Sequence, residues 1–332
     1  MKKSILAILL TTCLLLTACG KSQPVSTGEK VIEKTNEKVS VILDWVPNTN
    51  HTGMYIALEK GYYSDAGLDV TINTPAEETA LLLLSSGKAD FGVSFQEEIA
   101  TARSAEVPLP VVAVAALIQH NTSGILSLKK TEINSPKGME NKNYATWDLP
   151  VEKAILNDVI TKDGGDFSKV NMIPSTVTDI ISALNTNIDA VWIFYGWDGI
   201  ATKVKGLETN FIAFKDINPV FDFYTPVLAS NEAYLKNNPE NAKKFLAATA
   251  KGYEYAIQNP EDAAKILVKY APETDLQIAT ESQKYLATQY KAEVEKWGYI
   301  DNARWQAFYD WMYNQKLLTK PLQEGFTNDF LN

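Results

Sequence analysis

The chain has 332 residues, 45% of them hydrophobic, and a formal net charge of −9 at pH 7. An acidic chain without a basic stripe is a poor candidate for nucleic-acid binding, and this length suits two lobes better than one core. Only two histidines, His51 and His120, are present, which excludes a histidine-rich metal site.

Residues 1–18, with a lysine pair followed by an apolar run, are typical of a signal peptide. The segment Leu16–Gly20 resembles a bacterial lipobox, which predicts cleavage before Cys19 and diacylation of its thiol. The alternative is an ordinary secretory signal with an incidental cysteine. Residues 19–38 are polar and predict a flexible tether. Since the other cysteine lies within the signal, a disulfide or a cysteine-based metal site is excluded, and we expect no metal and no cofactor.

A strand is predicted at 39–43 and a helix at 52–60. The loop between them carries an acid, an indole and polar side chains: Asp44, Trp45, Asn48 and His51. In open α/β sheets, ligands dock at such strand ends, and this mixture suits a flat heterocycle with a polar edge. The alternative is purely structural, with Asn50 capping the helix and Trp45 in the core.

Further along, strand-like and helix-like patterns alternate, which predicts an α/β fold with mostly parallel sheets. The pattern restarts after Lys130. We therefore predict a first lobe from residues 39–126 and 227–332 and a second lobe from 127–226. The two crossings between them, near 126–130 and 223–227, would permit hinge closure. Helical spacing in the last part of the chain predicts helices at 239–257, 260–270 and 275–295, and Asp301 is predicted to cap a final helix.

Five blocks of sequence carry a family resemblance: 43–53, Glu59–Tyr63, Ala66–Val70, Ser86–Val93 and Tyr144–Trp147. With the signal segment and the two-lobe pattern, they resemble a type II periplasmic binding protein of an ABC importer. The resemblance is strongest to the branch related to yeast hydroxymethylpyrimidine synthase, which includes formylaminopyrimidine-binding proteins.

The resemblance implies a monomeric, non-enzymatic binding protein, lipid-anchored at the outer face of the bacterial cell membrane. It would deliver a small heterocyclic thiamine precursor to a permease and its ATPase subunits. An aminopyrimidine would be held between aromatic rings and anchored by a carboxylate.

The ligand-binding residues that the resemblance implies lie at strand ends and crossings: Asp44, Trp45, Asn48, His51, Tyr55, Phe95, Gln96, Gln119, Trp147, Tyr195, Asp198, Asp222 and Tyr224. Relatives often carry a glutamate where this chain has Asp198, one methylene shorter, which leaves the ligand open.

Other functions remain open at this point. A flavin would stack on the same aromatic rings as a pyrimidine. A nitrate or sulfonate would require a cationic side chain in the cleft, and the arginine nearest to a cleft loop, Arg103, lies well inside a predicted helix. A pyrimidine-synthase-like enzyme would carry a cysteine-rich iron motif, and no cysteine follows Cys19.

Overall fold

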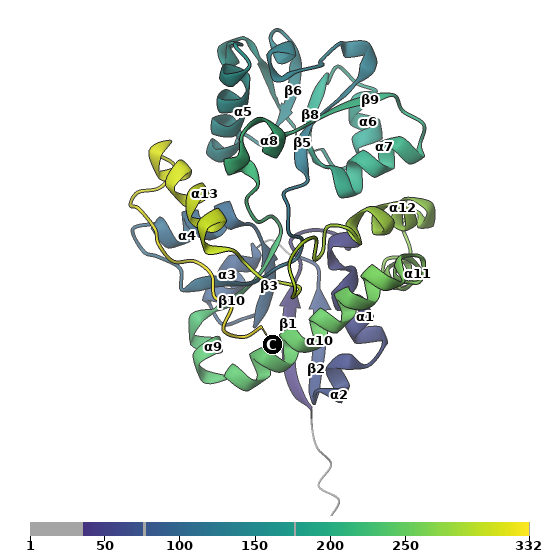
Figure 1. The fold of residues 1–332 in the computed structure, drawn as a ribbon, viewed down its shortest axis with the longest axis vertical. Helices are drawn as coiled ribbons and strands as arrows, with labels where there is room; N and C mark the ends of the chain where they lie inside the picture. Colours follow the sequence, from purple (N-terminus) through teal and green to yellow (C-terminus); the bar gives the residue numbers. More distant parts are fainter. Residues whose placement is uncertain (1–35, 76–77, 176, 332) are drawn as a thin grey trace, which may run out of the picture. The chain divides into compact units, whose positions relative to one another are not determined.

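The computed structural model describes residues 36–75, 78–175 and 177–331, which belong to one compact unit. The predicted signal peptide, Cys19 and nearly all of the tether lie outside these residues. Two five-stranded sheets organise the chain (Figure 1). None of the described helices is both long enough and apolar enough to cross a bilayer.

The first sheet has the order β2-β1-β3-β10-β4 and the second β7-β6-β8-β5-β9. The strands of the first sheet are β1 (Glu37–Ile42), β2 (Leu68–Asn73), β3 (Phe91–Ser94), β4 (Val111–Ala116) and β10 (Val227–Asn231). Those of the second are β5 (Ser123–Leu128), β6 (Asn143–Thr146), β7 (Asn171–Pro174), β8 (Ala190–Phe194) and β9 (Thr209–Ala213). We call the parts built on these sheets the first and second lobes.

Each sheet contains one reversed strand, β10 in the first lobe and β5 in the second. The remaining strands of each sheet share one direction, so the expectation of mostly parallel strands holds, although both sheets are mixed. Both reversed strands are the first that the chain forms after it changes sheet. In α/β sheets of this kind the carboxyl ends of the parallel strands mark the place for ligands.

The first crossing lies earlier than the sequence predicts. The chain leaves β4 at Ala116 and enters the second sheet at Ser123, because β5 pairs with β8 and β9. Its apolar pattern predicts a strand without revealing the partner strands, since pairing is a long-range property. A Cβ atom at Gly124 would collide with the backbone of Ile212 on β9, so glycine permits this close approach.

The helices of the first lobe are α1 (Thr52–Glu59), α2 (Tyr62–Asp65), α3 (Ala80–Ser85), α4 (Gln96–Ser104), α9 (Glu232–Asn237), α10 (Pro239–Gln258), α11 (Pro260–Tyr270), α12 (Leu276–Leu286) and α13 (Asn302–Asn314). The second lobe has α5 (Pro150–Lys162), α6 (Ile180–Leu184), α7 (Ile200–Val204), α8 (Phe214–Ile217) and a π-helical turn, η5 (Tyr195–Gly199). Short 3-10 turns are η1 (Thr49–His51), η2 (Lys129–Thr131), η3 (Pro136–Met139), η4 (Phe167–Lys169) and η6 (Pro219–Phe221).

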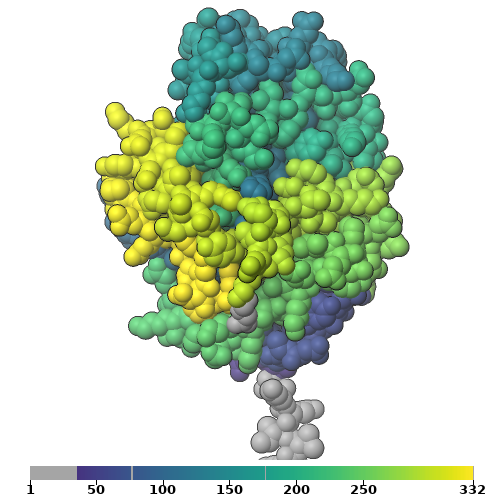
Figure 2. All heavy atoms as spheres, in the orientation of Figure 1, coloured from purple at the N-terminus to yellow at the C-terminus, as the bar shows by residue number. Residues whose placement is uncertain are grey.

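The helix expected at 275–295 ends at Leu286, so its predicted second half is wrong. The chain turns there, and the buried Tyr290 points its hydroxyl back to Thr49 O at 2.6 Å. The apolar spacing of this stretch therefore reflects burial in an irregular segment. Near the same place α12 contacts α7 and η5 of the second lobe, where yellow-green and teal atoms meet in Figure 2.

Helix α1, which follows the first candidate loop, is fixed by close packing on α10. A Cβ atom at Gly252 would collide with the backbone of Gly53, so the two glycines allow the helix backbones to touch. Met54, Ile56 and Ala57 are completely buried in the same core. The loop before α1 is therefore attached to a rigid part of the first lobe.

Candidate functional site

The loop after β1 is folded around His51, which is completely buried. The backbone N–H of Asn48 donates to His51 Nδ1 at 3.1 Å, so the neutral ring must carry its proton on Nε2. The Nε2–H group then donates to Asp44 Oδ1 at 2.6 Å. This pairing orients the Asp44 carboxylate, and the Asp44 side chain stays 12% exposed.

Trp45 is 37% exposed, so the interpretation that places it in the core is wrong. The expected cap at Asn50 is also wrong, because Asn48 Oδ1 accepts from the backbone N–H of Asn50 at 2.9 Å. The Asn48 side chain also donates to Val46 O at 3.1 Å. Asn48 and His51 therefore shape the loop, whereas Asp44 remains slightly and Trp45 more fully accessible to solvent.

The strand ends of the two lobes approach each other at two phenylalanines. Phe95 follows β3, and its ring lies 6.3 Å from that of Phe194 at the end of β8, with an interplanar angle of 15°. The pairing of Ile42 with Gly92 brings the segment after β1 beside the end of β3. There Ser94 Oγ donates to Glu98 Oε2 at 2.7 Å, so Glu98 is an acid near the site that sequence reasoning missed.

In the second lobe Trp147 follows β6 and is 40% exposed. Its ring centroid lies 6.0 Å from that of Trp192, which packs on Phe214 at 4.3 Å. The next residue, Asp148, has a φ of 64°, an uncommon left-handed conformation for a residue other than glycine. Each lobe thus presents an exposed indole within three residues of the end of a strand, Trp45 in the first lobe and Trp147 in the second.

The end of β8 continues into the π-helical turn η5, a structure often found at functional sites. Tyr195 lies between Phe211 and Tyr285, at centroid distances of 4.8 and 5.3 Å. Asp198 is half-buried, and burial together with nearby Asp179 raises its pKa to about 7. Near neutral pH this carboxyl therefore exists in both protonation states.

Helix α12 connects η5 with the loop after β1. Ser282 of α12 is completely buried, and its hydroxyl donates to Gly196 O in η5. The hydroxyl of Thr49 contacts the same Ser282 oxygen at 2.5 Å. One serine therefore couples the two segments that carry Asp44 and Asp198.

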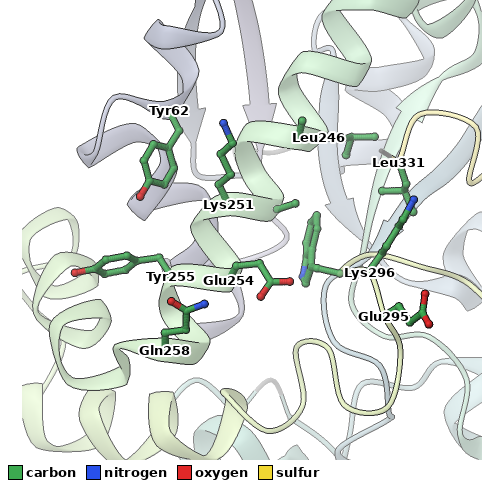
Figure 3. A pocket seen from close by; sticks show the side chains of 12 residues that line it. Tyr62, Leu246, Lys251, Glu254, Tyr255, Gln258, Glu295, Lys296 and Leu331 are labelled. Atoms are coloured by element: carbon green, nitrogen blue, oxygen red, sulfur yellow. The ribbon is translucent and has the colours of Figure 1, made fainter.

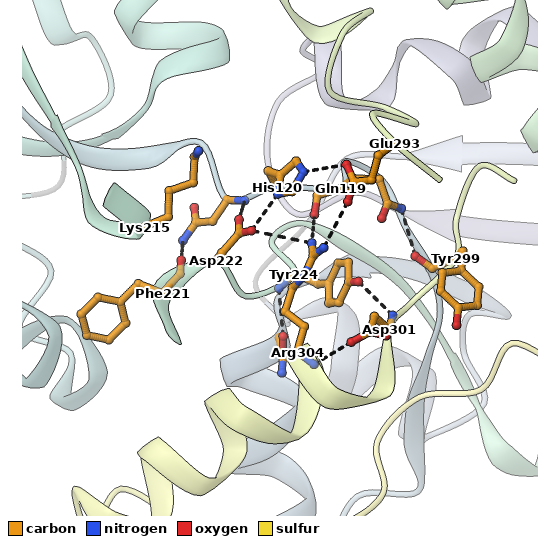
Figure 4. Close-up of polar contacts among 12 residues, drawn as sticks. Gln119, His120, Lys215, Phe221, Asp222, Tyr224, Glu293, Tyr299, Asp301 and Arg304 are labelled. Carbon is orange, nitrogen blue, oxygen red and sulfur yellow. Dashed lines mark hydrogen bonds and ion pairs between the residues drawn. The ribbon is translucent and has the colours of Figure 1, made fainter. Parts of the chain in front are cut away.

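Four expected site residues lie in a polar network at the two crossings (Figure 4). Asp222 Oδ2 is 2.7 Å from His120 Nδ1, and Gln119 donates to Tyr299 O at 2.9 Å. The hydroxyl of Tyr224 accepts from Asp301 N at 2.9 Å. Gln96, completely buried, donates to Trp305 O and accepts from Tyr224 N. These bonds connect the crossings to α4 and α13.

Tyr55 is placed away from this region, against α11. Its ring stacks on Tyr270 at 5.1 Å, and burial, with a smaller effect of Glu273, raises its pKa to about 12. The structure therefore brings Asp44, Trp45 and Phe95 to the strand ends of the first lobe. On the second lobe, Trp147, Tyr195 and Asp198 follow β6 and β8.

A groove of about 560 Å³ lies elsewhere in the first lobe (Figure 3). It is lined by Tyr62, residues of α10 and the segment 295–297, and none of the expected ligand-binding residues reaches it. Within the described ranges, acidic, cysteine and histidine side chains form no group of three or more suited to a metal ion.

Comparisons with known proteins agree with this architecture. The chain is 28% identical to the formylaminopyrimidine-binding protein of Halalkalibacterium halodurans, over 97% of both chains. It is 25% identical to the 4-amino-5-hydroxymethyl-2-methylpyrimidine phosphate synthase THI13 of Saccharomyces cerevisiae, over 90% of this chain and 89% of the synthase. The riboflavin-binding protein RibY of Chloroflexus aurantiacus is 22% identical over 100% of this chain and 98% of that protein.

Among solved structures, the alkanesulfonate-binding protein SsuA from Xanthomonas axonopodis pv. citri, bound to MOPS, matches with a TM-score of 0.68. The match covers 87% of this chain and 98% of SsuA at 13% identity, so the two proteins share the fold of periplasmic binding proteins. The NMT1/THI5-like family model matches residues 48–263, and the chain belongs to that family.

Proposed function

We propose that the protein is an extracytoplasmic substrate-binding protein of an ABC importer that binds a pyrimidine precursor of thiamine, of the formylaminopyrimidine or hydroxymethylpyrimidine type. The observation that carries this proposal is the pair of partly exposed indoles, Trp45 and Trp147, one after a strand of each lobe. The full-length similarity to a formylaminopyrimidine-binding protein supports the same ligand class.

The chemistry of the site suits an aminopyrimidine. Each aromatic face that stacks on the ring contributes about 1–3 kcal/mol, by analogy with base stacking. Asp44, oriented by His51, offers a carboxylate that accepts from the exocyclic amino group. Two stacking faces and one charged hydrogen bond bring the total toward the roughly 8–12 kcal/mol of a micromolar-to-nanomolar binder.

Riboflavin is the second candidate ligand, because an isoalloxazine ring stacks on the same indoles and RibY is similar over its whole length. A nitrate- or sulfonate-like anion is less favoured. Arg103 donates to Val111 O and pairs with Glu232, which keeps its charge engaged in the first lobe. The enzyme alternative is disfavoured because the chain has only two cysteines, both within its first 19 residues.

A thermal-shift screen with formylaminopyrimidine, hydroxymethylpyrimidine, thiamine, riboflavin, nitrate and an alkanesulfonate tests the ligand, since a ligand that binds only the folded state raises the melting temperature. We expect the largest shift with a pyrimidine precursor, followed by calorimetric confirmation. A shift with riboflavin alone would support the proposed binding function but contradict the proposed pyrimidine ligand. Conversion of a pyrimidine to a new product would overturn the binding role.

The same proposal includes a lipid anchor at Cys19, a monomeric state and delivery of the ligand to a permease and its ATPase. The lipobox-like segment supports the anchor. Mass spectrometry of the mature N-terminus should find a diacylated Cys19, and an unmodified terminus at another residue would contradict the anchor.

We also propose that the lobes close around the ligand by turning about the two crossings. The support is that the chain passes between the two sheets only through two short segments without a strand, 117–122 and 222–226. Small-angle scattering should give a smaller radius of gyration for the ligand-saturated protein than for the free protein. Equal radii at proven saturation would overturn closure.

A further inference from the structure

The short segment between β6 and α5 places Trp147 at the surface in an unusual backbone conformation. Asp148 adopts its left-handed φ of 64° while its N–H donates to Thr146 Oγ1 at 2.8 Å. Such a conformation is unfavourable for a residue other than glycine and persists only where neighbouring groups stabilise it. The groups that stabilise this turn therefore determine where the Trp147 indole lies.

Those groups converge on Glu152, which is 1% exposed and lies in the first turn of α5. Its carboxylate accepts from the hydroxyl of Tyr144 and from the hydroxyl of Thr146, each at 2.8 Å. It also accepts from the backbone N–H groups of Trp147 and Leu149, at 3.3 and 3.4 Å. All four donors belong to residues 144–149, the strand end and turn that carry the indole.

The position of Glu152 explains how a buried carboxylate is tolerated here. It lies near the N-terminus of α5, where the helix dipole favours a negative charge, and four donors replace its water. None of the four is a cation, so the network is not an ordinary buried ion pair. The hydroxyl of Thr146 serves twice, since it donates to Glu152 and accepts from Asp148 N.

We infer that Glu152 is a positioning residue for ligand recognition, which acts through Trp147 by fixing the turn that presents its indole. The inference rests on the proposed function, because it assumes that Trp147 stacks on the ligand. It adds a residue outside the ligand contacts to the recognition machinery. It also gives the buried Glu152 carboxylate a role, which is to hold the turn between β6 and α5.

A double-mutant cycle on ligand affinity tests the inference. Glu152→Gln keeps the shape but replaces one accepting oxygen by a donating amide, so two of the four donors lose their acceptor. We expect binding of the ligand identified in the screen, a pyrimidine or riboflavin, to weaken about tenfold, by analogy with residues that orient metal ligands, whose loss costs about 10–100-fold. In the Trp147→Ala background the same change should cost less than about twofold, because residues that act through each other are not additive. Full, multiplicative effects in both backgrounds would overturn the inference.

Glu140→Gln is the matched control, because Glu140 of the second lobe also accepts a backbone N–H, that of Asp166 at 2.8 Å, far along the chain from Trp147. It should leave affinity unchanged. If Glu152→Gln fails to fold, Thr146→Val replaces it, since this substitution removes the hydroxyl that links Glu152 to Asp148.

A second measurement does not depend on any ligand and separates this inference from the proposed function. With fluorotryptophan incorporated, the Trp147 signal is assigned from its loss in Trp147→Phe. Glu152→Gln should shift or broaden that signal and leave the Trp45 signal unchanged. An unaltered Trp147 signal would overturn the positioning role even if the protein binds a pyrimidine.

Discussion

The loops after β1 and β6 present the same kind of side chain by opposite chemical means. In the first lobe a buried neutral histidine, His51, accepts one hydrogen bond and donates another, and the acceptor of that second bond is Asp44. In the second lobe a buried carboxylate, Glu152, accepts four hydrogen bonds and donates none. The first arrangement orients the carboxylate of Asp44, whereas the second, as we infer above, positions the indole of Trp147.

The two lobes therefore supply different parts of ligand recognition. Because His51 bonds directly to Asp44, the first lobe can offer a charged acceptor whose direction is fixed before a ligand arrives. The acid of the second lobe, Asp198, lies in another segment, η5, and its raised pKa makes it a poorer permanent charge at neutral pH. We therefore expect the polar edge of the ligand to face the first lobe.

The largest effect is expected from His51→Ala, which removes both hydrogen bonds of the His51 ring in the first lobe. Removing the ring leaves Asn48 N and Asp44 Oδ1 without their partner in a buried place, so unfolding should become easier by about 2–4 kcal/mol. Urea unfolding monitored by fluorescence measures this change. Asn50→Ala is the control in the same loop, and equal losses for both variants would contradict the role of His51.

The two indoles themselves allow a direct comparison of the lobes. Trp45→Ala and Trp147→Ala should each weaken ligand binding by about 1–3 kcal/mol, because each removes one stacking face. More than half of each side chain is buried, so the free energy of unfolding should fall as well, and affinities are compared only among variants that remain folded. Calorimetric titration gives the affinities, and Val46→Ala, at an exposed neighbour of Trp45, should change neither quantity. If only one indole variant weakens binding, the ligand lies on a single lobe.

The two acids, Asp44 and Asp198, should contribute unequally to ligand binding. If the first lobe anchors the ligand, Asp44→Asn should cost about 1.5–3 kcal/mol of binding free energy, since it replaces a charged acceptor and keeps the shape. Asp198→Asn should then cost less. Calorimetry on both folded variants decides, and a larger loss for Asp198→Asn would move the anchor to the second lobe. If neither variant weakens binding, no carboxylate anchors the ligand.

The raised pKa of Asp198 should make the free energy of unfolding depend on pH. Burial raises its pKa from 3.8 to about 7, so the folded protein holds a proton that the unfolded chain releases between these values. Stability contributed by this group therefore falls as the pH rises from 3.8 toward 7. Asp198→Asn should be more stable than the parent at pH 8, on the order of 1–3 kcal/mol, and nearly equal to it below pH 4. Chemical unfolding at both pH values checks this, and a destabilised variant at pH 8 would contradict it.

The smallest effect is expected at the crossings. Hydrogen bonding to Asp222 raises the pKa of His120 above 6.5, despite an opposing effect of burial, and Glu293 raises it further. A raised histidine pKa stabilises the fold below pH 6.5, and this contribution is lost as the pH rises through the folded-state value. His120→Gln should therefore cost about 1 kcal/mol at pH 5.5 and less at pH 9. A cost that is independent of pH would contradict this prediction.

The sequence predicted the two-lobe α/β fold and the polar loop after the first strand, because both depend on local patterns. Strand alternation, the helix at 52–59 and the polar loop before it are signals within a few residues. The partner of β5 could not be predicted in this way, since strand pairing is decided by distant residues such as Ile212. The same limit explains the helix that ends at Leu286, where a hydrogen bond from Tyr290 to Thr49 replaces helical continuation.

The division of the candidate site into contacting and supporting residues was also beyond the sequence. Asn48 and His51 are polar, but only the structure shows that their polar atoms are used within the loop. Glu152 was missed because an acid in the first turn of a helix usually indicates favourable interaction with the dipole and no further role. Its sequence signal was its place three residues after the segment Trp147–Leu149 and two residues after Pro150.

The reversed strand β10 has a consequence for how the protein is made. It lies between β3 and β4, so these two strands have no hydrogen-bonded neighbour on their shared side until β10 arrives. During synthesis, all strands of the second sheet are complete before Val227 is added. A growing chain can therefore complete the second sheet early, while the first remains an open pair of edges that other chains can occupy. Completion of the first sheet therefore waits for β10, which joins β4 to β3.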